Sequence, residues 1–237
     1  MKLFYDLHLH SCLSPCGDEE MTPANLAGMC ALAGLNVVAL TDHNTSDNCP
    51  AFCQAAQKLG LIALAGMELC TREEIHVICL FPTPQAAQPF SRYVQDRLPP
   101  IPNNPEIFGR QIHMGPEDRV LGEETKLLAA AADIGIDEAC TLAARFGGLA
   151  YPAHIDRDSF SLLSVLGIWD PNLGFSLAEL SRNAPPHFSQ QPDLAGVGLL
   201  TGSDAHYLHQ IPDARFALEA DQSTPQGVLD ALRRRSF

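Results

Sequence analysis

The sequence predicts an α/β fold in which about seven parallel strands close, or nearly close, into a barrel. Short apolar runs alternate along the chain with segments of helical character, which is the pattern of repeated βα units. The length of 237 residues suits one large domain with a sizeable core, and we find no convincing linker. Histidines and carboxylates fall where apolar runs end, at the edge where such barrels carry their chemistry.

Each expected element rests on a local pattern. Thr22 and Pro23 provide an N-cap and a proline at the first helical position, and Gly34 provides a stop, so residues 24–33 should form a helix. The other expected helices are residues 49–59, 123–132, 137–146 and 224–235, and residues 85–97 permit one more. The expected strands are residues 3–9, 36–40, 61–65, 75–81, 148–152, 177–180, 197–201 and 216–220.

Residues 82–122 interrupt this rhythm, because prolines are frequent there. Long irregular segments in compact domains are usually functional or disordered. We therefore expect one domain over residues 1–237, with residues 82–122 as an insertion or lid within it.

Composition limits the class of protein. The chain has 15 basic and 28 acidic residues, a net charge of −13, which disfavours broad binding to long nucleic acids. No apolar run is long enough for a membrane helix, and residues 1–10 lack the apolar core of a secretory signal. The eight cysteines form no CxxC pair, so reduced, mostly buried thiols in a cytoplasmic protein are expected.

Metal-capable side chains follow the expected strands in order. The series consists of His8, His10, Asp42, His43, Glu68, His76, His154, Asp204 and His206. Any one histidine is more often an ordinary core or surface residue than a ligand, and this interpretation stands for His113, His187 and His209. It is weak for the other six together, because each lies within or just after an apolar run.

The chemistry of these residue types favours transition metals. In His8-Leu9-His10 the strand period of two places both imidazoles on one side. Imidazoles beside carboxylates suit Zn, Mn or Fe better than Ca or Mg, and the carboxylate of Glu68 can bridge two cations. Asp6 and Asp42 lie next to the histidines and could accept a spare ring N–H, which would fix ring orientation.

The series resembles the motifs of the polymerase and histidinol phosphatase (PHP) family. The matching segments are Asp6-Leu7-His8-Leu9-His10-Ser11, Thr41-Asp42-His43, Gly66-Met67-Glu68, Glu74-Ile75-His76, Pro152-Ala153-His154 and Ser203-Asp204-Ala205-His206. The resemblance implies a distorted seven-stranded β/α barrel with two or three divalent metal ions. It further implies three ligand sets: His8, His10, Glu68 and Asp204 for the first ion, His43, His206 and an early Asp for the second, and Glu68, His76 and His154 for the third.

The early Asp departs from the usual family pattern. Counting back from Thr22-Pro23 places Asp18 at that position, whereas counting forward from His10 reaches Pro15, which cannot ligate. We expect Asp18 to be the ligand. Cys16 is the alternative because thiolate binds zinc well, although it is equally interpreted as a turn thiol.

The resemblance and the ligand series together predict a phosphoester hydrolase. The nucleophile would be a hydroxide shared by two cations, with no side-chain nucleophile. The substrate would be a small phosphomonoester or nucleotide. Arg157 could grip its phosphate, although an ion pair with Asp156 or Asp158 is an equal interpretation, and His113 could contact substrate from the lid.

Two alternatives remain open from the sequence. The same site would serve a metal-dependent nuclease acting on short nucleic-acid ends. A non-catalytic metal-binding regulatory module is the alternative from a different class. Oligomeric state, metal identity and the substrate itself are not encoded in any pattern that we can read.

Overall fold

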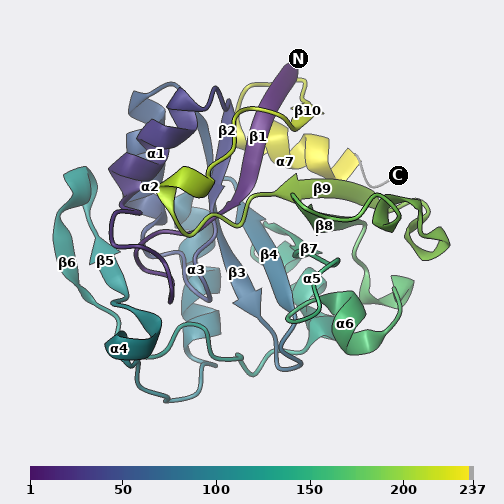
Figure 1. Ribbon diagram of the computed structural model, residues 1–237, viewed down its shortest axis with the longest axis horizontal. Coiled ribbons are helices and arrows are strands. Elements are labelled where there is room, and N and C mark those ends of the chain that lie inside the picture. The colour runs from purple at the N-terminus through teal and green to yellow at the C-terminus, as the bar shows by residue number, and fades with distance from the viewer. Residues whose placement is uncertain (235–237) are drawn as a thin grey trace.

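The computed structural model describes residues 1–234, and a curled six-stranded sheet forms its centre (Figure 1). In spatial order the strands are β10 (Ala217–Glu219), β1 (Lys2–Leu9), β2 (Val37–Leu40), β3 (Ile62–Cys70), β4 (His76–Phe81) and β7 (Leu149–Pro152). Strands β1, β2 and β3 are mutually parallel, as expected for βα units. Strand β4 runs antiparallel to both β3 and β7, and β10 runs antiparallel to β1, so the expectation of uniformly parallel strands is wrong at these two places.

A separate parallel pair, β8 (Leu177–Ser181) and β9 (Gly198–Gly202), lies between the two ends of the curled sheet. Strand β8 contacts β7, and β9 contacts β1. Backbone hydrogen bonds connect the pair to the sheet on both sides, among them one from Ile155 N to the Glu179 carbonyl and one from Asp204 N to the His8 carbonyl. The result is an α/β half-barrel whose open side is covered by this pair.

Seven helices accompany the strands over the described residues. They are α1 (Pro23–Leu32), α2 (Cys49–Lys58), α3 (Pro84–Gln95), α4 (Pro105–Phe108), α5 (Ile136–Arg145), α6 (Leu162–Leu166) and α7 (Pro225–Arg234). The first helix begins as expected, since the Thr22 side chain accepts a hydrogen bond from Asn25 N. The last was expected to reach residue 235, which lies outside the described residues.

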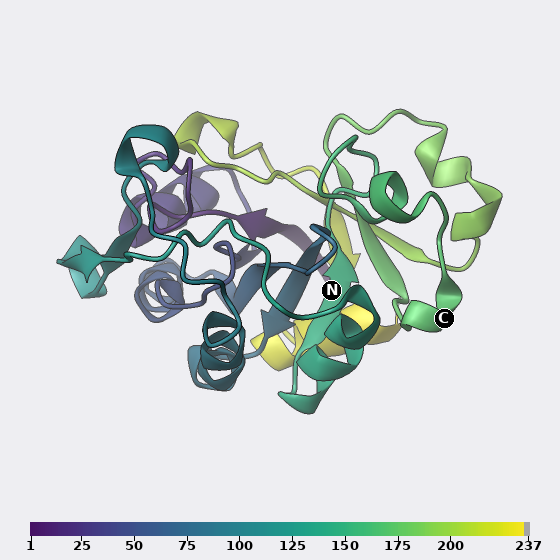
Figure 2. The ribbon, with the colours of Figure 1, turned by 90° about the horizontal axis from the view of Figure 1, so that it is seen from below.

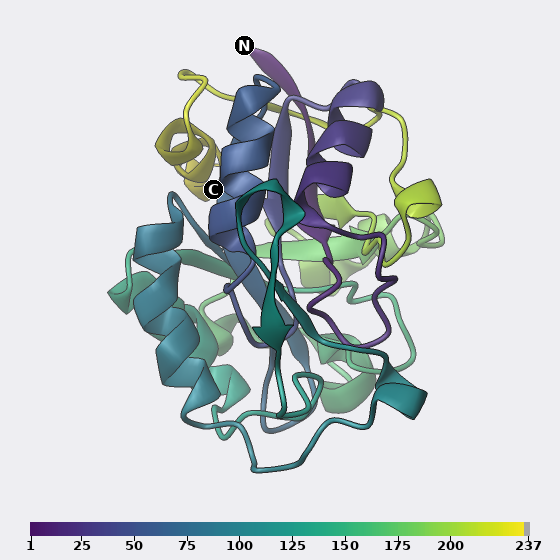
Figure 3. The same ribbon diagram turned by 90° about the vertical axis from the view of Figure 1, so that its left-hand side faces the viewer.

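Two apolar cores determine which end of the barrel is apolar and which end carries polar groups. The larger core lies between the sheet and the helices α1, α2, α3 and α5; Figure 3 shows the first three standing along the outer face. The second core fills the inside of the curled sheet and includes Val228, Leu229 and Leu232 of α7. Figure 2 shows this helix beside the strands when the molecule is seen from below. Because apolar side chains fill that end of the interior, polar groups collect at the opposite end, where β1, β2 and β3 finish.

The segment after residue 82 is more regular than its prolines suggest. Helix α3 covers β3 and β4, and α4 is followed by a hairpin of β5 (Ile112–Met114) and β6 (Val120–Glu123). The loops after β1 and β2 hold β5: Ile112 N donates to the Cys12 carbonyl, and the Asn48 side chain bonds backbone groups of Ile112 and Met114.

The expected helix at residues 123–132 does not form. Residues 123–127 are extended and residues 128–130 turn, because the Gln111 side chain donates to the carbonyls of Glu124 and Lys126 and accepts from Leu128 N. These bonds satisfy the backbone groups that a helix would otherwise pair. All eight cysteines are free, and no helix within residues 1–234 is long and apolar enough to cross a membrane.

Candidate metal centre

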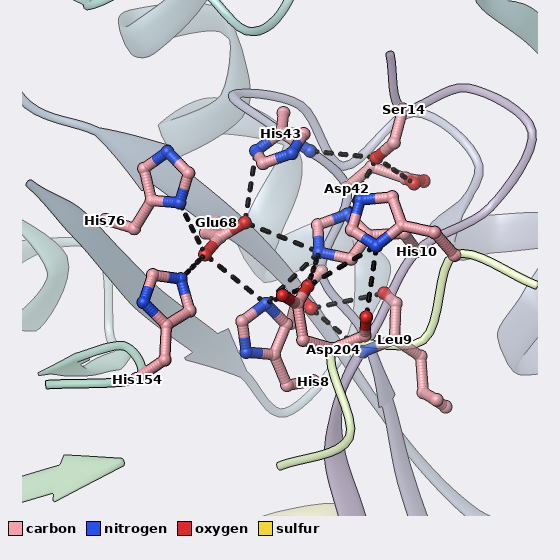
Figure 4. Close-up of polar contacts among 12 residues, drawn as sticks. His8, Leu9, His10, Ser14, Asp42, His43, Glu68, His76, His154 and Asp204 are labelled. Carbon is pink, nitrogen blue, oxygen red and sulfur yellow. Dashed lines mark hydrogen bonds and ion pairs between the residues drawn. The ribbon is translucent and has the colours of Figure 1, made fainter. Parts of the chain in front are cut away.

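One buried carboxylate, that of Glu68, lies within reach of five imidazoles (Figure 4). Its Oε1 atom is 2.9 Å from His76 Nδ1, 3.1 Å from His154 Nε2 and 3.3 Å from His8 Nε2. Its Oε2 atom is 3.1 Å from His43 Nδ1 and 3.3 Å from His10 Nε2. The two oxygens therefore face different sets of rings, which is the arrangement of a carboxylate that bridges two ions.

The strand ends place these groups by simple geometry. His8 and His10 close β1 and point to the same side, while Leu9 between them is buried in the outer core. Glu68 lies inside β3 rather than after it, because the strand continues to Cys70. His154 and Asp204 follow β7 and β9 with φ values of +29° and +52°. Such backbone is strained for residues other than glycine and is concentrated at functional sites.

A second group surrounds the Asp204 carboxylate. Its Oδ1 atom is 3.0 Å from His10 Nε2 and 3.3 Å from His8 Nε2, and these two ring nitrogens are 3.1 Å apart. The His206 ring stacks on His10 with the centroids 4.1 Å apart. Three sets of donor atoms lie close enough to share an ion: His8 with His10, Glu68 and Asp204; His10 with His43 and His206; and His43 with Glu68 and His76.

The carboxylates of the site are held in their charged form. Burial alone would raise the pKa of Glu68, but His76, His8 and His43 outweigh it and keep that pKa well below the usual range. Burial would likewise raise the pKa of Asp204, and the charges of His8 and His10 lower it instead. Both side chains therefore stay available as anionic ligands in a buried site.

Four imidazoles of the centre divide into two classes by the direction in which their pKa is shifted. Burial lowers the pKa of His43 to about 4 and that of His206 to about 3, so both rings are neutral at pH 7. Burial would also lower the pKa of His10, but hydrogen bonds to Asp204 and Glu68 raise it to about 9. In His8, burial is outweighed by Glu179, Glu68 and Asp204, and the pKa lies well above the usual value. Without a cation, this pair keeps protons to balance the surrounding carboxylates.

Further side chains behind the rings fix their orientation. The Glu179 carboxylate on β8 lies 2.7 Å from His8 Nδ1 and also accepts from His154 N. Behind His10, the Ser14 hydroxyl lies 2.8 Å from Nδ1 and donates to the Asp42 carboxylate. With the outer nitrogens engaged in this way, the inner Nε2 atoms of both rings face the centre.

Asp6 and Asp42 support the backbone and a hydroxyl rather than a ring. Asp6 accepts from the backbone N–H groups of His8 and Ser203, and burial raises its pKa to about 6. Asp42 accepts from Ser11 N, from the Ser11 hydroxyl and from Ser14, so it reaches His10 only through Ser14. The sequence reasoning missed Glu179 and Ser14; the available signal was a single charged residue inside the apolar run 177–180.

The donor set fits divalent cations. Within residues 1–234, four buried metal-capable atoms of the centre make no well-directed hydrogen bond although they lie close to one another or to other ring nitrogens: His43 Nδ1, His76 Nδ1, Glu68 Oε2 and Asp204 Oδ1. Buried polar atoms are normally satisfied, and unpaired ones are costly. Imidazole nitrogens and carboxylate oxygens are ligands of Zn, Mn and Fe, so cations would satisfy all four atoms at once.

Four other residues named from the sequence belong to none of the three ligand sets. The carboxylate of Asp18 accepts from Glu20 N, although the backbone N–H of this residue donates to the His206 carbonyl. Cys16 is exposed, with φ of +63°. Arg157 pairs with Asp204, Nη1 to Oδ2, at 2.6 Å, while Asp156 accepts from Ser181 instead. His113 on β5 lies 3.8 Å from Asp47 and 3.6 Å from Glu124.

Fold and site together define an α/β protein whose strand ends carry clustered histidines and carboxylates able to hold divalent cations. A family model, the PHP domain, matches residues 6–162, more than half of the chain. The protein belongs to the PHP domain family, whose members are metal-dependent hydrolases that include phosphoesterases and nucleases.

Comparison with curated proteins finds a 5′-3′ exoribonuclease of Haemophilus influenzae, which is 35% identical over 79 residues. That match covers 32% of this chain and 28% of the exoribonuclease.

Two solved structures share the fold. Endonuclease Q of Pyrococcus furiosus, a lesion-specific endonuclease, superimposes with a TM-score of 0.69 at 20% identity. The matched region covers 99% of this chain and 56% of the endonuclease chain. The chain thus spans just over half the length of that enzyme. A protein of Bifidobacterium adolescentis, provisionally described as a metal-dependent phosphoesterase, has a TM-score of 0.62 at 18% identity over 97% of this chain and 96% of its own.

Proposed function

We propose that the protein is a metal-dependent phosphoester hydrolase that acts on a small phosphomonoester or nucleotide. The observation that carries the proposal is the Glu68 carboxylate, whose two oxygens face two groups of imidazoles. Paired cations on a shared carboxylate are typical of enzymes that cleave phosphate esters. Family membership supports the same reaction class.

The ligands are proposed as the sequence motifs suggested. His8, His10, Glu68 and Asp204 would hold the first ion, and Glu68 would bridge to an ion completed by His76 and His154. His43 and His206 would hold a further ion, for which His10 lies near enough to contribute. Asp18 remains the proposed early ligand, because its backbone already contacts His206. The ions would be Zn, Mn or Fe, two or three in number.

Bound divalent cations would supply Lewis acidity at the phosphate oxygens and lower the pKa of a water toward about 7. The chain's own side chains would orient the reactants. The Ser11 oxygen accepts hydrogen bonds from Leu13 N and the Asn48 amide, and the Ser14 oxygen accepts from His43 N and lies 2.8 Å from His10 Nδ1. Neither oxygen has a free lone pair directed at a substrate, so attack is assigned to water. Arg157 uses Nη1 on Asp204, and its planar fork would present the remaining N–H groups to a phosphate.

Two architectural proposals accompany this function. The β8–β9 pair would complete a distorted seven-stranded barrel, since it contacts both β7 and β1. Residues 82–122 would act as the insertion or lid of a single domain, with His113 reaching the substrate from the β5–β6 hairpin.

The test is an activity panel on protein stripped of metal and reloaded with Mn, Zn or Fe. The panel contains sugar phosphates, nucleoside monophosphates, dinucleotides and short single-stranded oligomers. We expect hydrolysis of small esters in the loaded protein, and a loss of about a thousandfold in His8→Ala and Asp204→Ala. Full activity in either variant, with the fold retained, would overturn the mechanism.

A nuclease acting on short nucleic-acid ends is the second candidate. It is favoured by the exoribonuclease and endonuclease relatives, whereas the net charge of −13 disfavours long polynucleotides. Oligomer cleavage without monoester cleavage in the same panel would select it. A protein that binds metal and cleaves nothing would instead be a regulatory metal-binding module.

A further inference from the structure

Phe160 is an exposed aromatic side chain beside the candidate metal centre. It lies in the loop between His154 and α6, and its side chain is 43% exposed. Its ring stacks on the His76 imidazole with the centroids 4.8 Å apart and an angle of 29°. His76 therefore covers one face of the ring, and the exposed part of the side chain lies away from that contact.

The backbone at Phe160 is unusual for a large side chain. Its φ is +53°, in the left-handed region that bulky residues avoid. Two neighbours hold this conformation. His76 N donates a hydrogen bond of 2.9 Å to the Phe160 carbonyl. The next residue, Ser161, caps α6 with its side chain and donates to the Arg157 carbonyl. The surrounding contacts thus over-determine a strained position, as is found at binding and catalytic sites.

Packing does not account for this placement. Phe160 is not one of the buried residues that form the apolar clusters of residues 1–234, and the ring contact recorded for it is with His76. An apolar ring in water and a strained backbone both cost stability. The contacts with His76 hold the residue in place but leave 43% of it exposed, and a planar ligand would cover that exposed part of the ring.

The neighbouring charge indicates what kind of ligand fits. Arg157 lies three residues before Phe160, is 42% exposed and pairs with Asp204 of the centre. The same short loop therefore presents the Arg157 guanidinium, which can bind a phosphate, and the Phe160 ring, on which a planar group can stack. Nucleobases stack on exposed aromatic side chains through their π faces, whatever their sequence.

We propose that Phe160 is a substrate-binding residue on which a nucleobase stacks, so that the phosphoester cleaved at the centre belongs to a nucleotide. The proposal rests on the proposed function and narrows its substrate class. Phe160 would contribute to substrate binding, whereas the metal-binding histidines and carboxylates would contribute to the chemical step.

The kinetic test compares adenosine 5′-monophosphate with ribose 5-phosphate, which carries the same phosphoester without a base. Phe160→Leu keeps an apolar cover on His76 but removes the aromatic face, and Phe160→Trp restores one. We expect Phe160→Leu to raise KM for the nucleotide roughly 5- to 150-fold more than KM for ribose 5-phosphate, with KM for the nucleotide recovered in Phe160→Trp. Equal effects on both substrates, or on neither, would overturn the proposal.

A binding measurement separates failure of this proposal from failure of the proposed function. The fluorescence of 2-aminopurine riboside 5′-monophosphate should be quenched on the metal-loaded protein and much less on Phe160→Leu, whether or not any ester is hydrolysed. Val165→Ala is the control, because Val165 is an exposed apolar residue of α6, 44% exposed. Equal loss of quenching in Val165→Ala and Phe160→Leu would mean that the base does not stack specifically on Phe160, and would overturn the proposal.

Discussion

Replacing Glu179 by Gln tests whether the residue behind His8 sets the affinity of the centre for metal. Glu179 is buried, its carboxylate lies 2.7 Å from His8 Nδ1, and it packs against Gly202. The amide has nearly the same shape, so packing is retained and only the charge is removed. His8 would then be oriented by a neutral hydrogen bond instead of a charge-assisted one.

The size of the effect follows from that exchange. A hydrogen bond to a charged group contributes about 1.5–3 kcal/mol and a neutral one about 0.5–1.5 kcal/mol. The difference of about 1–1.5 kcal/mol corresponds to roughly tenfold weaker metal binding. Removing a negative charge near a bound cation also weakens metal binding. Side chains that hydrogen-bond a metal-binding histidine commonly contribute about 10- to 100-fold to metal affinity.

The assay is competition between the protein and a chromophoric chelator for Zn or Mn. We expect Glu179→Gln to bind the metal about 10- to 100-fold more weakly than the wild type, with an unchanged circular dichroism spectrum. Glu106→Gln is the matched control, because Glu106 is exposed on α4. Wild-type affinity in Glu179→Gln, or an equal loss in the control, would refute the role assigned to Glu179.

The remaining predictions concern the protons and the packing of the same centre. The pKa of His10 is raised to about 9 in the metal-free protein and that of His8 is raised in the same direction, so metal binding at pH 7 should release protons, and the release from His10 should fall as pH rises through about 9. Calorimetry in buffers of different ionisation enthalpy measures this release, and binding without proton release would contradict the prediction. In Gly202→Ala the new methyl group would collide with Glu179 Oε2 and lie 2.7 Å from His8 Cβ, so we expect a loss of about 1–3 kcal/mol and a Tm several degrees lower. Gly28→Ala, where the methyl group meets nothing within 4 Å, should melt no lower than the wild type, and equal melting of the two variants would count against the packing argument.

Most residues of the candidate centre could be predicted from the sequence, because the direction of side chains along a strand depends only on local spacing. The spacing in His8-Leu9-His10 fixes a common side for both rings, and the ends of parallel strands meet at one edge of a sheet. Whether Asp18 ligates depends on the conformation of an irregular loop, which no periodicity encodes. The structure brings Asp18 next to His206 through the backbone alone.

The direction of β4 could have been read from the length of its connection. Residues 71–75 join β3 to β4, too few for the crossover that parallel strands require. The connection looked longer in the sequence because the third strand was expected to end at residue 65, whereas it continues through Glu68 to Cys70. An apolar run marks where a strand is buried but not where it ends.

The failed helix at residues 123–132 shows tertiary contacts overriding local preference. Its leucines and alanines favour a helix. The Gln111 side chain, distant in sequence, binds the backbone of Glu124, Lys126 and Leu128 in an extended form. Glu179 was missed for a related reason, since its partner His8 lies 171 residues away.

The central claim is that the imidazoles around Glu68 hold neighbouring divalent cations. A crystal structure of the Mn-loaded protein, with anomalous difference maps recorded on both sides of the metal edge, tests it most directly. We predict separate anomalous peaks on the two sides of the Glu68 carboxylate, one among His8, His10 and Asp204 and another beside His76. Maps without such peaks at saturating metal, in crystals that retain the fold, would contradict the claim.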